Sequence, residues 1–102
     1  ARGIFVSSTF KTSLSLEELF EVYENFYEGQ IFTTVSRKEI NLKQVVNTNR
    51  CLINIEKNGD FAVVHSAIDN LLKGASGQAI HNMNISFGFP ENAGLKLKSI
   101  AF

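Results

Sequence analysis

Two glycines three residues apart, Gly74 and Gly77, are the first feature of this 102-residue sequence that suggests chemistry. They follow an apolar, strand-like run and precede a run with helical spacing. Glycine lets a ligand approach the backbone closely, and a helix N-terminus offers unpaired N–H groups to a polar or anionic ligand. The pattern favours a binding site for such a group. On spacing alone, a glycine-punctuated loop before an ordinary amphipathic helix is the simpler explanation.

The helix expected after Gly77 has one apolar side and one side rich in amides. The apolar residues recur at three- and four-residue steps: Ala75, Ala79, Ile80, Met83 and Phe87. The other side has Gln78, His81, Asn82 and Asn84. Helix surfaces usually carry Glu, Lys and Arg, so a side of amides indicates specific hydrogen bonding.

The sequence of residues 66–84 closely resembles the C-terminal signature of the N-acetyl-gamma-glutamyl-phosphate reductases. These NADP-dependent enzymes of arginine biosynthesis are related to aspartate-semialdehyde dehydrogenase. Further matching segments follow in the same order: Arg2-Gly3-Ile4, Asn49-Arg50-Cys51, Gly88-Phe89-Pro90-Glu91 and Gly94-Leu95. The resemblance therefore spans the whole chain. One residue departs from it, because the family usually has Gln where this chain has His81.

The resemblance implies a domain of an oxidoreductase that reduces N-acetyl-glutamyl 5-phosphate to the semialdehyde with NADPH. It assigns contacts with NADP to five residues: Gly74, Gly77, Gln78, His81 and Asn82. It also implies a homo-oligomer, because in this superfamily subunits associate through the sheet of the C-terminal domain. The family's cysteine nucleophile, acid/base histidine and dinucleotide-binding domain belong to segments before Ala1. We therefore expect residues 1–102 to be a single catalytic and dimerisation domain, cut from a longer protein and inactive alone.

The remaining reactive side chains have plainer explanations. Cys51 lies in an expected strand without a nearby histidine, which favours a structural thiol over a nucleophile. His65 lies in an apolar run and is expected to pack, and two scattered histidines do not indicate a metal site. Lys73 suits either a phosphate contact or a solvated loop. Arg2 lies near the substrate pocket by analogy alone.

Composition excludes several classes of partner. The hydrophobic fraction is 44%, and ten basic residues balance ten acidic ones. This balance argues against a dedicated nucleic-acid surface or a surface for anionic membranes. No apolar run is long enough to span a bilayer. The single cysteine fits a reducing, cytoplasmic location.

The periodicity predicts an α+β domain with a mostly antiparallel or mixed sheet, and with two main helices on one face. This is the arrangement of the C-terminal domain of glyceraldehyde-3-phosphate and aspartate-semialdehyde dehydrogenase-like enzymes. The expected strands are 3–10, 31–35, 42–46, 51–56 and 61–68, with a tail or edge strand at 95–102. Ser15 and Glu18 form a capping box for a helix that Gly29 stops, and Asn58-Gly59 predicts a hairpin. Gly88-Phe89-Pro90 ends the second helix.

Two helices on one face leave the other face of the sheet open, which favours pairing with a second copy. Two classes of function fit these patterns. One is the reductase domain, which supplies subunit contacts and part of the cofactor and substrate cleft. The other is a non-enzymatic α+β assembly or binding module. The long match at 66–84, with further matches in the right order, favours the first.

Overall fold

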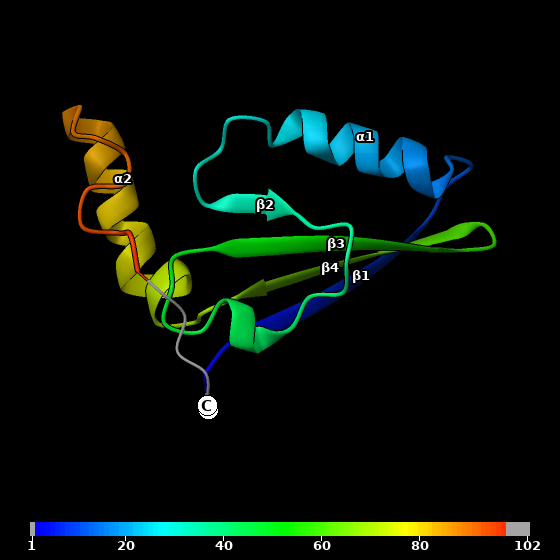
Figure 1. The fold of residues 1–102 in the computed structure, drawn as a ribbon, viewed down its shortest axis with the longest axis horizontal. Coiled ribbons are helices and arrows are strands. Elements are labelled where there is room, and N and C mark those ends of the chain that lie inside the picture. Colours follow the sequence, from blue (N-terminus) through cyan, green and yellow to red (C-terminus); the bar gives the residue numbers. More distant parts are fainter. Residues whose placement is uncertain (1, 98–102) are drawn as a thin grey trace.

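A computed structural model describes residues 2–97, which form a four-stranded sheet with one helix across it and another beyond its end (Figure 1). The strands are β1 (Ile4–Lys11), β2 (Thr33–Val35), β3 (Cys51–Asn58) and β4 (Phe61–Ile68), in the spatial order β1-β4-β3-β2. Strand β4 is antiparallel to β1 and β3, whereas β2 is parallel to β3. The predicted α+β class and mixed sheet are confirmed.

Helix α1 (Leu16–Phe26) begins at the predicted capping box. The Glu18 N–H donates to the Ser15 hydroxyl at 3.2 Å, and the Ser15 N–H donates to the Glu18 carboxylate at 3.1 Å. The helix packs through Leu19 and Phe20 against Ile55 of β3 and Ala62 of β4. A local polar signal thus starts the helix, and burial of one apolar side fixes it on the sheet.

The opposite face of the sheet is partly covered by residues 40–46. Ile40 and Val45 are buried against Leu52 and Ala67, whose side chains point away from α1. The strand predicted at 42–46 is wrong, because the chain forms the 3₁₀ helix η1 (Leu42–Gln44) and turns. The Val45 and Val46 N–H groups donate back to the Leu42 carbonyl, so burial in a turn overrides the strand preference of valine.

The predicted hairpin between β3 and β4 forms one residue later than expected. Asn58 pairs with Phe61, so Gly59 and Asp60 are the two central residues. Gly59 has φ +59°. Asp60 does not have a positive φ, because Asn47 is the one non-glycine residue of the described chain that does. A positive φ at the first central position alone is the pattern of a type II′ turn.

Helix α2 (Gly77–Phe87) continues directly from the short π-helix η2 (Leu72–Ser76) and projects past the end of the sheet (Figure 1). Its position differs from the expected one, because only α1 lies across the sheet. The helix ends as predicted, at Gly88 with φ +72°. Leu95 to Leu97 are not a strand, and the rest of the predicted edge strand lies outside the described residues.

Candidate functional site

Asp69 anchors the segment that carries the predicted cofactor contacts. Its fully buried carboxylate accepts the N–H groups of Leu71 at 2.8 Å and Leu72 at 3.2 Å, and the Asn47 N–H at 2.6 Å. Arg2, which precedes β1, adds an ion pair. Burial raises the pKa of Asp69, but the backbone and guanidinium hydrogen bonds outweigh it and leave that pKa below its usual value. Arg2 is thus held in a structural pair.

The helical segment therefore starts before Gly77, with η2 at Leu72, and the Asp69 carboxylate binds the N–H groups at its beginning. The Gly74 N–H donates to the Asp69 carbonyl at 3.0 Å, and the Gly77 N–H donates to the Leu72 carbonyl. The expectation of unpaired N–H groups at these glycines is wrong, because η2 supplies the preceding turn. Whether Gly74 and Gly77 contact NADP stays a prediction.

Gly77 has a different structural role from Gly74. A Cβ atom on Gly77 would lie 1.6 Å from the Asn49 Oδ1 atom and 2.7 Å from the Leu72 carbonyl oxygen. Asn49 is buried, and its Nδ2 group donates to the Leu95 carbonyl at 3.0 Å. Its Oδ1 atom has no hydrogen-bond partner within the described residues. A side chain at position 77 would displace Asn49, whereas Gly74 is exposed and has room for a methyl group.

Gln78 and Asn82 form a pair of amides on α2. The Gln78 Nε2 group donates to the Asn82 Oδ1 atom at 3.0 Å. This leaves the Gln78 carbonyl oxygen and the Asn82 Nδ2 group for a ligand, and Asn82 is exposed. A carboxamide or a hydroxyl can bond to both groups, so this part of the predicted NADP contact fits the chemistry of the residues present.

His81 is turned into a separate cluster. Its Nε2 atom lies 2.8 Å from the Glu91 carboxylate and its Nδ1 atom lies 3.3 Å from the Lys73 ammonium. The ring also meets the Phe32 ring edge-on, with centroids 5.1 Å apart. The imidazole is therefore engaged by protein groups on both nitrogens. Sequence reasoning missed Phe32 and Glu91 as its partners, because no short-range pattern joins them to α2.

Lys73 and Cys51 are both partly buried. The Lys73 ammonium lies 5.7 Å from the centroid of the Phe32 ring, and burial lowers the pKa of this lysine. Burial also raises the pKa of Cys51, partly offset by Lys73. The Cys51 thiol is therefore protonated near neutral pH and a poor nucleophile, which supports the structural interpretation. The solvated alternative for Lys73 does not match its half-buried position.

His65 lies on the sheet face opposite α1 in a hydrogen-bonded chain. Its Nδ1 atom is 2.7 Å from the Ser7 hydroxyl, and its Nε2 atom is 2.6 Å from the Glu56 carboxylate. The Phe5 ring packs beside it at 5.6 Å between centroids. Both ring nitrogens are satisfied, as expected for a packing histidine. Across residues 2–97, no three His, Cys, Asp or Glu side chains converge as a metal site requires. In the same range, no helix has the length and apolar composition to cross a membrane.

Comparison with known families identifies the class of domain. The family described as "Semialdehyde dehydrogenase, dimerisation domain" matches residues 1–70. The chain belongs to this family.

Curated relatives narrow the resemblance further. The chain is 54% identical over 101 residues to the N-acetyl-gamma-glutamyl-phosphate reductase of Bacteroides fragilis. The match covers 99% of the chain and 31% of that protein. It is 50% identical over 102 residues to the reductase of Parabacteroides distasonis, covering 100% of the chain and 32% of the relative. The Flavobacterium johnsoniae reductase is 50% identical over 101 residues. The chain thus spans about a third of the length of the curated relatives it matches, and the resemblance inferred from residues 66–84 is confirmed.

Proposed function

We propose that this chain is the dimerisation domain of an N-acetyl-gamma-glutamyl-phosphate reductase. The observation that carries the proposal is the 54% identity to such a reductase over 99% of the chain. The parent enzyme would reduce N-acetyl-glutamyl 5-phosphate to the 5-semialdehyde in arginine biosynthesis, in the cytoplasm. Bound NADPH would supply the hydride. This domain would supply subunit contacts and one wall of the cofactor and substrate cleft.

Strand β1 supports the oligomeric part of the proposal. It is an edge strand, and all eight of its residues are exposed. Four of them are large and apolar: Ile4, Phe5, Val6 and Phe10. An edge strand that is long and apolar is normally paired or covered in the functional assembly. A second copy of the domain is the occupant that the family description favours.

The oligomeric state tests this role of β1. We expect light scattering to show a dimer or larger species for the 102-residue chain at micromolar to millimolar concentration. Val6→Glu should shift it to monomer, because a carboxylate would be buried without a partner. Val22→Glu is the matched control, since Val22 is similarly exposed but lies on α1. A wild-type chain that is monomeric throughout this range would contradict the role of β1.

Helix α2 supports the cleft-forming part. Its amides Gln78 and Asn82 would hold the carboxamide or a ribose hydroxyl of the cofactor, and its exposed apolar residues would contact the rest of the parent enzyme. His81, bound to Glu91 and Lys73, would shape the cleft beside them. The roles of these residues stay predictions.

An activity assay separates the domain from the whole enzyme. We expect the 102-residue chain to give no NADPH oxidation with N-acetyl-glutamyl phosphate, because Cys51 is half-buried with a raised pKa and no histidine among the described residues bonds to it. The full-length parent is the positive control. Turnover by the chain above a no-protein control would show that it contains its own nucleophile. Absence of activity in the parent would favour the alternative, a non-enzymatic assembly module.

A further inference from the structure

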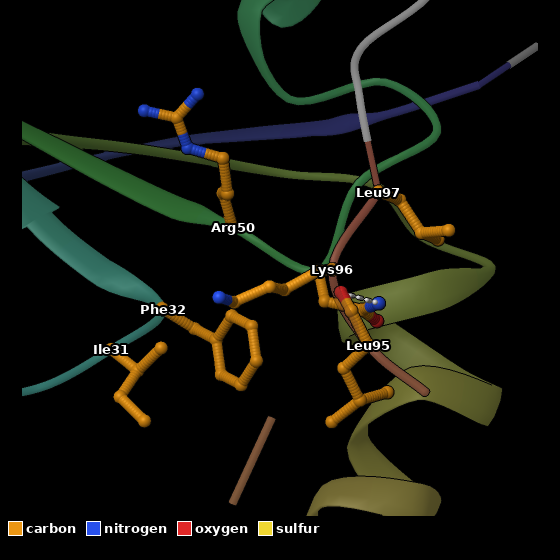
Figure 2. Close-up of a pocket in the computed structure, with 7 residues that line it drawn as sticks. Ile31, Phe32, Arg50, Leu95, Lys96 and Leu97 are labelled. Atoms are coloured by element: carbon orange, nitrogen blue, oxygen red, sulfur yellow. Dashed lines mark hydrogen bonds between the residues drawn. The ribbon is translucent and has the colours of Figure 1, made fainter. Parts of the chain in front are cut away.

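A pocket of about 410 Å³ opens between the start of β2, the start of β3 and the segment after α2 (Figure 2). It is lined by Ile31, Phe32, Asn49, Arg50, Leu95, Lys96 and Leu97. None of the five residues predicted to contact NADP belongs to it. Its volume lies in the range of sites that bind small organic molecules.

The inner wall of the pocket is apolar and fixed in place. Phe32 and Leu95 are both buried, and the Leu95 carbonyl accepts the hydrogen bond from Asn49 that closes the wall. Ile31 and Leu97 stand half-exposed at the opening. A ligand with an apolar group can therefore displace water from a preformed surface.

The opening of the pocket is positively charged. Figure 2 shows Lys96 reaching across the opening toward Phe32, while the side chain of Arg50 points the other way, away from Phe32 and Leu95. No lining residue is acidic, and within residues 2–97 neither cation forms an ion pair. A third cation, the Lys73 ammonium, lies 5.7 Å from the centroid of the Phe32 ring. Charge complementarity thus selects an anion.

We propose that this pocket binds a small organic anion, a carboxylate or a phosphate monoester, that carries an apolar group. Lys96 holds the charge, and the apolar group lies against Phe32 and Leu95. A neutral apolar molecule would leave the Lys96 ammonium without a partner, and a bare inorganic anion would leave the apolar wall exposed to water. The proposal does not depend on the reductase function, because it concerns residues of this chain alone and a probe of defined chemistry.

Titrations of the 102-residue chain, followed by backbone amide NMR, test the pocket directly. Phenyl phosphate and 3-phenylpropionate should both shift the amides of residues 31–32, 49–51 and 95–97 in a saturable way. The tighter of the two identifies the preferred head group. Benzyl alcohol and inorganic phosphate should each bind at least about fivefold more weakly, the factor that corresponds to about 1 kcal/mol. Absence of saturable binding by both organic anions, or equal binding of benzyl alcohol, would overturn the proposal.

A pair of lysine variants tests the charge. Lys96→Gln should weaken phenyl phosphate about fivefold with an unchanged circular dichroism spectrum, because the position is exposed. Lys43→Gln in η1 removes one exposed positive charge outside the pocket and should leave the affinity unchanged. Equal affinities of the wild type and Lys96→Gln, or equal weakening by both variants, would show that Lys96 does not hold the anion.

Discussion

Helices α1 and α2 are both eleven residues long, yet they stand in opposite relations to the rest of the chain. Helix α1 has a capping box and an acidic first turn, and its apolar Leu19 and Phe20 are buried on the sheet. Helix α2 contains no Asp, Glu, Lys or Arg and has no side-chain cap. Its buried residues are Gly77 and Asn84, and large apolar side chains are exposed instead: Ile80, Met83, Ile85 and Phe87.

The domain itself buries the inner side of α1, whereas it leaves most of α2 exposed. The charges of α1 suit water, and its Leu19 and Phe20 are covered by the sheet, although Val22 and Phe26 are exposed. Helix α2 has no charged residue to face water, and its large apolar side chains are not covered by this domain. This indicates that another part of the functional assembly covers them. The buried Asn84 of α2 donates to the carbonyls of Glu91 and Ala93 at 3.1 Å, so buried polar contacts help to hold the helix to the following segment.

The largest expected effect is a contrast between one apolar residue of each helix. Phe20→Ala should lower the free energy of unfolding by about 3–5 kcal/mol, because it removes a buried ring from beneath α1. Met83→Ala should change it by less than about 0.5 kcal/mol in the 102-residue chain, because Met83 is exposed. Urea denaturation at low protein concentration measures both. Equal losses would show that α2 is packed as firmly as α1.

The next effect compares the two glycines that precede and begin α2. Gly77→Ala should cost about 3 kcal/mol, because its methyl group would overlap Asn49 and the Leu72 carbonyl. Gly74→Ala should be neutral or stabilising by up to about 1 kcal/mol, because the site has room and Ala restricts the unfolded chain. Thermal unfolding of the two variants distinguishes them. If Gly77→Ala costs little stability, Asn49 moves easily, and so does Leu95, whose carbonyl accepts its hydrogen bond.

Asp69 links the sheet to the α2 segment, so its removal should act on that end of the molecule. Asp69→Asn should cost about 2–3 kcal/mol, chiefly because the buried backbone donors meet a weaker acceptor, with a smaller part from the loss of the half-exposed ion pair with Arg2. Hydrogen exchange should rise more in α2 than in α1.

The pH dependence of Asp69 has a defined sign. Its folded pKa lies below the unfolded value of about 3.9. Its contribution is therefore present above that unfolded value and is lost as the pH falls through the folded pKa. The Asp69→Asn variant should lose less stability than the wild type between about pH 5 and the acid limit of folding. Parallel acid unfolding curves would contradict this assignment.

Features set by neighbouring residues could be predicted from the sequence. The Ser15–Glu18 capping box, the Gly59 hairpin within one residue and the Gly88 stop of α2 all rest on contacts within a few positions. The failures depend on distant partners. Valines at 45 and 46 favour a strand locally, but both are buried in a turn, Val45 on the sheet face opposite α1. The contact between Asn49 and Gly77 is likewise invisible until β3 and α2 are placed.

The candidate site divides in the same way. The amide pair Gln78 and Asn82 follows from helical spacing, and the structure joins the two directly. The unpaired N–H groups expected at Gly77 require a helix start there, whereas the π-helix η2 already begins five residues earlier, at Leu72. Helical spacing groups His81 with the amides. In the structure its ring instead contacts Phe32 and Glu91, which come from other segments.

The smallest expected effect tests whether the amide side of α2 completes a cofactor site in the full-length parent. Gln78→Leu should lower kcat/KM for NADPH about tenfold, which corresponds to about 1.4 kcal/mol and lies in the range for one polar group left unpaired. The fold should survive, because Gln78 is only partly buried and its one side-chain hydrogen bond is to Asn82. Gln44→Leu in η1 is less suitable as a control, because Gln44 caps Asn41; Gln30→Leu, at an exposed position after α1, should leave kcat/KM unchanged. If Gln78→Leu folds normally and keeps the wild-type kcat/KM, the amides of α2 serve the helix and its covering partner, and the cofactor is held elsewhere.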